Sequence, residues 1–115
     1  MIDYNKELVA ALGKVLPTYD ELRLTSNSKT PCYSYQERNN YAEATGDTIG
    51  YSRIVFTVKV WACDLETLNR YAKEADKILR PIGFRRTSTN ELAQAGSTMR
   101  QKIMTFEALA LEEFE

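Results

Sequence analysis

The sequence predicts an α+β domain, in which an antiparallel sheet of four to five strands carries two helices packed on one face. Residues 51–62 alternate apolar and polar side chains with the period of a strand. Residues 65–79, directly behind them, carry an apolar stripe at helical spacing. Short polar turns join the other strand-like segments, which favours antiparallel pairing, and two amphipathic helices need a sheet face to cover. The expected order is helix, strand, strand, strand, helix, strand, strand.

The chain of 115 residues has the size of one domain, and we expect residues 1–115 to form a single unit. Apolar residues make up 43% of the chain, which is enough for a compact core. Fifteen Lys and Arg against sixteen Asp and Glu give a net charge of -1, which argues against a protein whose main role is to neutralise nucleic-acid phosphates. The absence of histidine removes the Ser-His-Asp and Cys-His nucleophile systems.

A helix is expected first, because apolar residues recur at helical spacing: Tyr4, Leu8, Ala11, Leu12 and Val15. Asp3 is the expected N-cap, and Pro17 ends the helix. Two short strands should follow at 19–25 and 32–38. Residues 39–50 contain two glycines and little periodicity, and we expect them to form a long loop. Such a loop is either a plain hairpin tip or a segment that orders against a partner.

The central strand gives the strongest pattern in the chain. Its apolar residues point one way: Ile54, Phe56, Val58, Val60 and Ala62. The other side is half-polar: Arg53, Val55, Thr57, Lys59 and Trp61. We expect the first face to lie in the core and the second to be only partly covered. Trp61 either packs over a neighbouring strand or helix end, or contacts another subunit, where tryptophan is enriched.

The second helix should begin after Asp64, its expected N-cap, and end at Pro81 and Gly83. Its apolar stripe comprises Leu65, Leu68, Ala72, Ala75, Ile78 and Leu79. Two strands, at 84–92 and 99–111, should close the domain. The last strand is apolar on parts of both sides, which suggests cover on both faces, including cover by another chain. The acidic tail at 112–115 is expected to be frayed.

No combination of residues predicts an active site, a cofactor or a metal centre. The five glycines are scattered, so they form no phosphate-binding loop. Cys32 and Cys63 cannot complete a structural zinc site without histidine, and we expect reduced thiols, although one bridge stays open if their strands are neighbours. The N-terminus lacks a targeting pattern, and the longest nearly apolar run, 54–63, is too short to span a bilayer. We therefore expect no enzyme, and a cytoplasmic protein without membrane association.

Four segments follow one another in a suggestive order. They are Pro-Cys-Tyr-Ser-Tyr at 31–35, a strand ending in Trp-Ala at 61–62 with a helix directly behind it, Pro-Ile-Gly-Phe-Arg-Arg at 81–86, and Met-Arg-Gln-Lys-Ile-Met-Thr-Phe-Glu-Ala at 99–108. In this order the chain resembles the small tail-completion or tail-terminator proteins of long-tailed siphophages and their prophages, over roughly residues 4–111. The shared motifs are structural patterns and include no catalytic signature.

The resemblance implies a structural protein that forms a ring, typically a hexamer when assembled, which caps the tail tube and joins the tail to the head connector. The implied partners are further copies of the chain, the tail tube protein and the head-tail connector protein, while DNA passes through the lumen without specific binding. The implied location is the host cytoplasm during assembly and then the virion tail.

Because such a protein acts through surfaces, we expect interface residues in the 39–50 loop and on the outward face of the central strand. These are Asn39, Asn40, Tyr41, Glu43, Asp47, Arg53, Val55, Lys59 and Trp61. Two rival classes remain open. One is another phage neck component, such as a head-completion protein. The other is an unrelated α+β module that binds nucleic acid or a small ligand.

Overall fold

A computed structural model describes residues 4–24, 29–44, 49–93 and 99–113, with the backbone alone at 39–44, 49–52, 92–93 and 110–113. In chain order the elements are α1 (Asn5–Gly13), β1 (Thr18–Asp20), the 3-10 turn η1 (Glu21–Arg23), β2 (Cys32–Ala44), β3 (Ile49–Ala62), α2 (Leu65–Leu79), the 3-10 turn η2 (Arg80–Ile82), β4 (Arg85–Ala93) and β5 (Arg100–Glu113).

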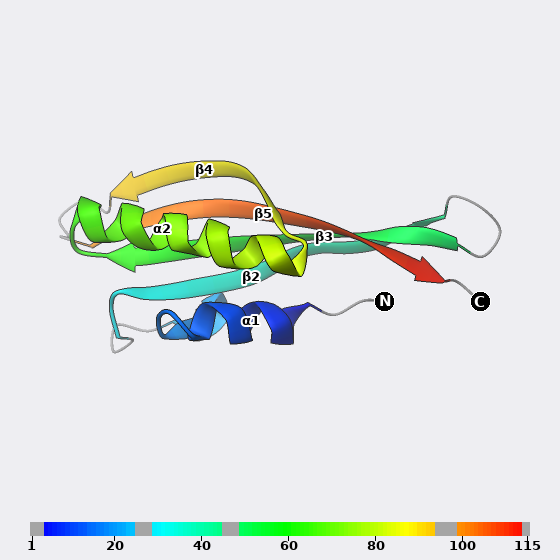
Figure 1. Cartoon of the computed structure of the whole chain (residues 1–115). Helices are drawn as coiled ribbons and strands as arrows, with labels where there is room; N and C mark the ends of the chain where they lie inside the picture. Colours follow the sequence, from blue (N-terminus) through cyan, green and yellow to red (C-terminus); the bar gives the residue numbers. More distant parts are fainter. Residues whose placement is uncertain (1–3, 25–28, 45–48, 94–98, 114–115) are drawn as a thin grey trace.

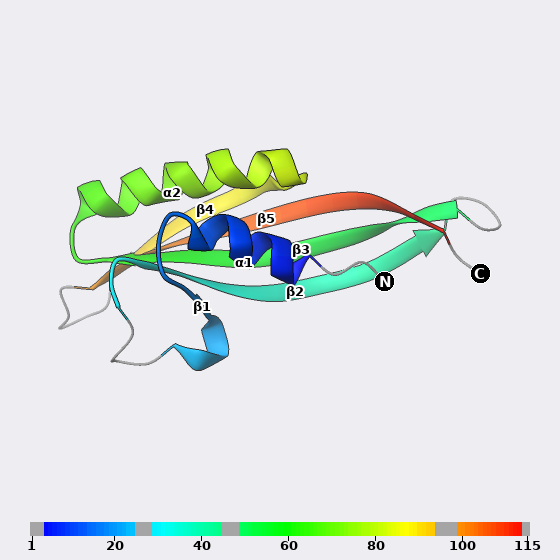
Figure 2. The same ribbon diagram turned by 60° about the horizontal axis from the view of Figure 1, so that its bottom comes forward.

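The strands of the described residues form one five-stranded sheet in the order β1-β2-β3-β5-β4. β1 runs parallel to β2, and the other neighbours pair antiparallel. Both helices lie on the same face of this sheet, α1 over the β1-β2 side and α2 over β3 and β5 (Figure 1, Figure 2). The expected α+β class, with two helices on one face of a five-stranded sheet, is confirmed. The sheet is antiparallel except for β1, which was expected to pair antiparallel and instead runs parallel to β2.

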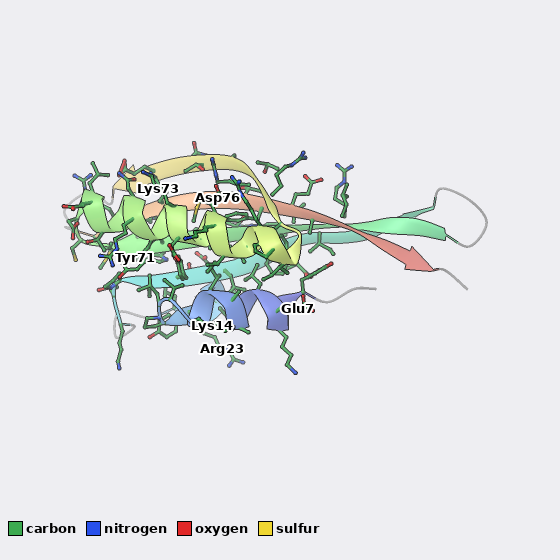
Figure 3. All side chains as sticks on the ribbon, in the orientation of Figure 1. Glu7, Lys14, Arg23, Tyr71, Lys73 and Asp76 are labelled. Atoms are coloured by element: carbon green, nitrogen blue, oxygen red, sulfur yellow. The ribbon has the colours of Figure 1, made fainter. Side chains whose placement is uncertain are left out.

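The core lies between the two helices and the sheet. From residue 54 onward, the even-numbered side chains of β3 are buried there, as the alternation of the sequence predicts: Ile54, Phe56, Val58, Val60 and Ala62. From the helices, the core receives Leu8, Leu12, Leu68, Ala72, Ala75 and Leu79. Phe84 packs against residues from both layers of this core, since its ring contacts Tyr4, just before α1, and Phe56 of β3 edge to face at centroid distances of 5.4 and 5.7 Å. Charged side chains such as Glu7 and Lys14 lie on the solvent side of α1 (Figure 3).

The ends of α2 follow from local chemistry. The carboxylate of Asp64 accepts hydrogen bonds from the backbone N–H of Thr67 at 2.8 Å and from its hydroxyl at 2.9 Å, so the expected N-cap is confirmed. At the other end Gly83 adopts φ 112°, the left-handed conformation that glycine tolerates best. The expected N-cap of α1, Asp3, lies outside the described residues.

Three expectations about irregular segments are corrected. The strand expected at 19–25 exists only as β1, because the side chain of Asp20 accepts the N–H of Leu22 and turns the chain into η1. The long loop expected at 39–50 is wrong, since residues 39–44 belong to β2 and residues 49–50 to β3. The tail expected to fray at 112–115 is paired through Glu113, opposite Ile49.

The misread loop has a physical explanation in the backbone. A register shift between Glu37 and Asn39 marks an extra residue in β2, and such a bulge breaks the two-residue alternation that identifies a strand. Beyond the bulge the sheet also leaves the cover of the helices (Figure 1). Strand positions beyond the cover of the helices are under less pressure to alternate apolar and polar residues.

The uncovered end of the sheet forms a projecting arm, defined here as residues 39–44, 49–53 and 109–113. β1 pairs only with residues 33–35 of β2, and β4 pairs with β5 only as far as Glu107. Within the described residues, both outer strands of the arm therefore have an open edge. The arm gives the molecule its length, with principal extents of 54 × 26 × 23 Å. No helix of the described part is long and apolar enough to cross a membrane.

Candidate protein-interaction surface

The face of the sheet opposite the helices, here called the outer face, holds the β3 side chains that were expected at an interface. On β3 it presents Arg53, Val55, Thr57, Lys59 and Trp61, and their register partners on β5 are Leu109, Glu107, Thr105, Ile103 and Gln101. Most of these residues are half-buried although no helix covers them. The outer face is therefore mixed in character, with Val55, Ile103 and Leu109 among charged and polar groups.

A polar network organises one end of the outer face. The indole N–H of Trp61 donates to the Ser34 hydroxyl at 2.9 Å, and that hydroxyl donates to Glu21 Oε2 at 3.1 Å. Lys59 Nζ donates to Glu21 Oε1 at 2.6 Å and lies 5.9 Å from the centre of the Trp61 ring. We call these four residues the Glu21 network. Its charged pair is well shielded, since the side chains of Lys59 and Glu21 are 18% and 19% exposed.

The turn η1 is what brings Glu21 to this face. Asp20 keeps an extended backbone, and its side chain accepts the Leu22 N–H at 2.9 Å, which closes a tight turn immediately after β1. Because β1 pairs beside β2, the residue that follows it lies near Ser34. The same turn leaves the Leu22 side chain 83% exposed.

The other end of the outer face leads into the arm. Arg53 Nε lies 3.5 Å from Glu107 Oε1, an ion pair between β3 and β5. Arg38, at the bulge, donates through Nε to the Thr57 hydroxyl at 3.0 Å. Beyond these ties Leu109 is 57% exposed, a large apolar side chain at the base of the arm. An exposed leucine beside open strand edges is a surface that another chain could cover.

The structure brings some of the expected interface residues together and separates others. Lys59 and Trp61 meet in the Glu21 network, while Arg53 and Val55 lie farther along β3 toward the arm. The backbone positions of Asn39, Tyr41 and Glu43 are opposite Val55, Arg53 and Tyr51 in the register. Asn40 is opposite the buried Ile54, at a position of the helix-covered face. Asp47 lies outside the described residues.

The cysteines and the buried tyrosine do not form a reactive centre. Burial raises the pKa of the Cys32 thiol to about 11, so it stays protonated and a poor nucleophile at neutral pH. Cys63 is exposed, and both cysteines are free. Burial, with a smaller contribution from Glu74, also raises the pKa of Tyr33, whose hydroxyl donates to the backbone carbonyl of Tyr71 at 2.6 Å. Among the described residues, no group of three His, Cys, Asp or Glu side chains could hold a metal ion.

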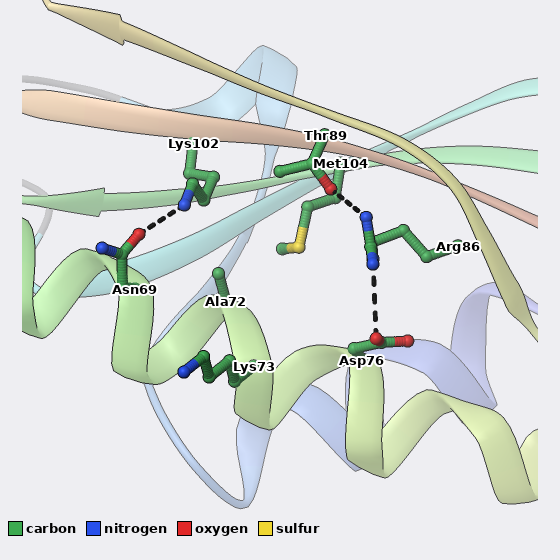
Figure 4. A pocket seen from close by; sticks show the side chains of 8 residues that line it. All are labelled: Asn69, Ala72, Lys73, Asp76, Arg86, Thr89, Lys102 and Met104. Carbon is green, nitrogen blue, oxygen red and sulfur yellow. Dashed lines mark hydrogen bonds and ion pairs between the residues drawn. The ribbon is translucent and has the colours of Figure 1, made fainter.

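A pocket lies on the helix side, between α2 and the β4-β5 edge, with a volume of about 340 Å³ (Figure 4). Lys102 donates to the Asn69 side-chain carbonyl, and Arg86 bridges Asp76 at 3.5 Å and the Thr89 hydroxyl at 2.6 Å. These contacts tie the helix to the sheet. We call this site the α2-β4 pocket. Its lining is net positive, because it contains one carboxylate, Asp76, and three basic side chains, Lys73, Arg86 and Lys102.

No protein-family model and no curated protein matches the sequence. Among solved structures, the chain is similar to a chain of the "Virion of native gene transfer agent (GTA) particle". The two share 15% sequence identity and a TM-score of 0.60, over 91% of this chain and 84% of the other. This likeness shows the fold. It extends over nearly the whole length of both chains, so the arrangement of sheet and helices is shared as one unit.

Three residues of the outer face escaped the sequence analysis: Glu21, Ser34 and Leu109. Glu21 and Ser34 belong to segments that were predicted to be ordinary alternating strands. Nothing in their spacing indicates that η1 places Glu21 against the outer face of the sheet. Leu109 had a usable signal, because the last strand is apolar on both sides while the helices can cover only one.

Proposed function

We propose that this protein is a structural component of a phage-type particle, which forms a ring with copies of itself, caps the tail tube and joins the tail to the head connector. The observation that supports the proposal is the fold shared with a chain of a gene transfer agent virion, a phage-like particle, across nearly all of both chains. The resemblance of the sequence to tail-terminator proteins rests on separate grounds, namely the order of its motifs.

The surface of the molecule suits such a role. The outer face has half-buried apolar side chains without cover, and the arm offers open strand edges at both sides within the described residues. Surfaces of this kind bind other protein chains, because a neighbouring subunit can supply both the apolar cover and the missing backbone partners. The role requires no bond-making centre, and the near-neutral charge of -1 suits a lumen that DNA crosses without being held.

The proposal is tested by assembly. The protein is co-expressed with a phage tail tube protein and, separately, with a head-tail connector protein. We expect negative-stain microscopy to show rings at the ends of tubes, and native mass spectrometry to give a closed oligomer, with six copies as the expected number. Monomers alone, with no binding to tube or connector, would contradict the proposal.

A pull-down with each partner separates the proposed role from that of another neck component. Binding to both tube and connector agrees with a terminator that joins the two structures. Binding to the connector alone would instead assign a head-completion role. Nucleic-acid binding that weakens steeply with salt, in the absence of any protein partner, would favour an unrelated binding module.

A further inference from the structure

An apolar groove runs between the two helices on the side of the molecule away from the sheet. Its floor consists of Ala11 and Val15 on the α1 side and of Ile78, Pro81 and Ile82 around the end of α2. Its volume is about 600 Å³, within the range of sites that take a ligand or an anchor side chain. The two helices lie antiparallel here, so the start of α1 is beside the end of α2 (Figure 1).

Charged side chains stand at the edges of this α1-α2 groove. Two positive charges come from Lys14, the residue directly after α1, and from Lys77 in α2, and Glu7 contributes one negative charge. Glu7 lies toward the start of α1 and Lys14 toward its end (Figure 3). The groove thus combines an apolar floor with a net positive rim. The matching occupant is a segment with an apolar side chain between carboxylates.

The chain itself contains such a segment. Residues 112–115 read Glu-Glu-Phe-Glu, with one aromatic residue flanked by carboxylates on both sides. In an extended segment alternate side chains point in opposite directions, so Phe114 can enter a groove while Glu113 and Glu115 remain at its rim. A phenylalanine gains more from apolar burial than a smaller side chain does.

A chain cannot place this segment in its own groove. Ala108 is the last buried residue among those of β5 whose side chains the structure describes, and pairing with β3 continues outward as far as Glu113. At about 3.4 Å per residue, the five residues after Ala108 carry the strand about 17 Å along the arm. The arm points away from the helices, and one further residue reaches less than 4 Å (Figure 2). A neighbouring copy is under no such constraint.

We propose that the α1-α2 groove binds residues 112–115 of a neighbouring copy of this chain, with Phe114 on the apolar floor and the flanking carboxylates at Lys14 and Lys77. The arm of one subunit then reaches the helical side of the next, a head-to-tail contact of the kind that closes a ring. This inference rests on the proposed ring in that it names one contact within it, but the contact can be measured without tail proteins.

The test uses a dye-labelled peptide of residues 108–115, Ala-Leu-Ala-Leu-Glu-Glu-Phe-Glu, titrated with the full-length chain and followed by fluorescence anisotropy. The receptor carries Phe114→Ala, so that its own tail does not compete. We expect saturable binding that weakens with salt, because part of the attraction is between exposed charges. The same peptide with Phe114→Ala should bind at least about tenfold more weakly, since it loses the buried ring.

Two charge-reversal variants of the receptor separate the groove from general attraction. Lys14→Glu/Lys77→Glu should weaken peptide binding at least about tenfold, and a peptide whose three Glu are changed to Lys should restore it. Lys6→Glu/Lys73→Glu makes the same change of net charge on the same two helices outside the groove, and it should change binding by less than about threefold. Equal losses in both variants would overturn the proposal.

The site is located by NMR on the labelled receptor. We expect the methyl signals of Ala11, Ile78 and Ile82 to shift on peptide addition, while Met104 in the α2-β4 pocket does not. Shifts at Met104 alone would place the acidic segment in the α2-β4 pocket and overturn the proposal. Binding weaker than about 1 mM, or binding indifferent to the Phe114 change, would overturn it as well.

Failure of this inference can be told from failure of the proposed function. If rings assemble on tail tubes but the peptide does not bind, the proposed groove contact is wrong and the proposed function still stands. If the peptide binds specifically but the protein binds neither tube nor connector and forms no ring, the groove contact stands and the proposed tail role is wrong.

Discussion

Glu21 is the residue on which the outer face depends. It accepts hydrogen bonds from Ser34 and Lys59, and through Ser34 it orients the indole of Trp61. Because Lys59 is largely shielded from water, its charge needs this partner more than an exposed lysine would. The network also fixes the side chains that a neighbouring subunit would meet.

Replacing Glu21 by alanine should lower the free energy of unfolding by about 1–3 kcal/mol, because Lys59 and Ser34 lose their acceptor. The control is Glu91→Ala, which removes an exposed ion pair with Arg100 at 3.6 Å and should cost less than about 1 kcal/mol. Urea unfolding followed by circular dichroism measures both. Equal losses of unfolding free energy in the two variants would show that the low exposure of the Glu21 network does not strengthen its contribution to stability.

The N-cap of α2 should make stability depend on pH. The backbone N–H and the hydroxyl of Thr67 hold the pKa of the Asp64 carboxyl below its ordinary value. A carboxyl whose folded pKa is depressed stabilises the fold above its unfolded pKa, and loses that contribution as the pH falls through the folded pKa. Asp64→Ala should therefore lower the urea midpoint at pH 7, and the difference should shrink as the pH falls below the ordinary pKa of an aspartate. A constant difference across this range would contradict the assignment.

At the scale of the elements, we expect alanine substitutions at two glycines, Gly83 and Gly13, to change the stability of the protein in opposite directions. Gly83 has φ 112° at the end of η2, so Gly83→Ala should destabilise the protein by about 1–2 kcal/mol. Gly13, the last residue of α1, has open space around an added Cβ, so Gly13→Ala should stabilise it by about 0.5–1 kcal/mol. Thermal unfolding of both variants checks the pair. A loss of stability in both would contradict the reading of Gly13.

Elements with one buried face were predictable from the sequence, whereas elements without one were not. β3 alternates cleanly because the helices cover one side of it, and α2 shows a stripe because it covers β3 and β5. The strand parts in the arm extend beyond the cover of the helices (Figure 1), and a bulge precedes them in β2, so their sequence resembles that of a loop. Leu65 was assigned to the buried stripe but is 43% exposed, because it lies in the first turn of α2, at the edge of the core.

The interface residues were harder to predict than the fold. Alternation placed Arg53, Val55, Lys59 and Trp61 on the correct face, and it left open what covers that face. Contacts such as those of Glu21 depend on a turn whose direction is set by one side chain, Asp20. Spacing in a sequence does not encode such a turn. Whether Trp61 also contacts another subunit stays a prediction.

For the molecule as a whole, the exposed leucine at the base of the arm offers a direct test of assembly. Leu109→Lys should change the free energy of unfolding by less than about 0.5 kcal/mol, because the side chain is largely in water. It should nevertheless reduce the yield of rings on tail tubes, because a charge there opposes burial by a neighbour. Leu65→Lys, on the helical side, is the control that should leave rings intact. Unchanged ring yields with Leu109→Lys would exclude this part of the outer face from the contact.

The position of β3 at the centre of the sheet also determines when the protein can finish folding. One edge of β3 pairs with β2, which is synthesised before it. The other edge pairs with β5, from Ala62 opposite Arg100 to Ile49 opposite Glu113, and β5 is the last strand to be synthesised. At about 5–20 residues per second, a ribosome takes seconds to deliver that last strand. During this interval a newly made chain displays Phe56 and its neighbours beside an incomplete sheet. Polysomes that carry many such nascent chains would hold these aggregation-prone intermediates close together, so the rate of translation through β4 and β5 bears directly on how much protein folds correctly.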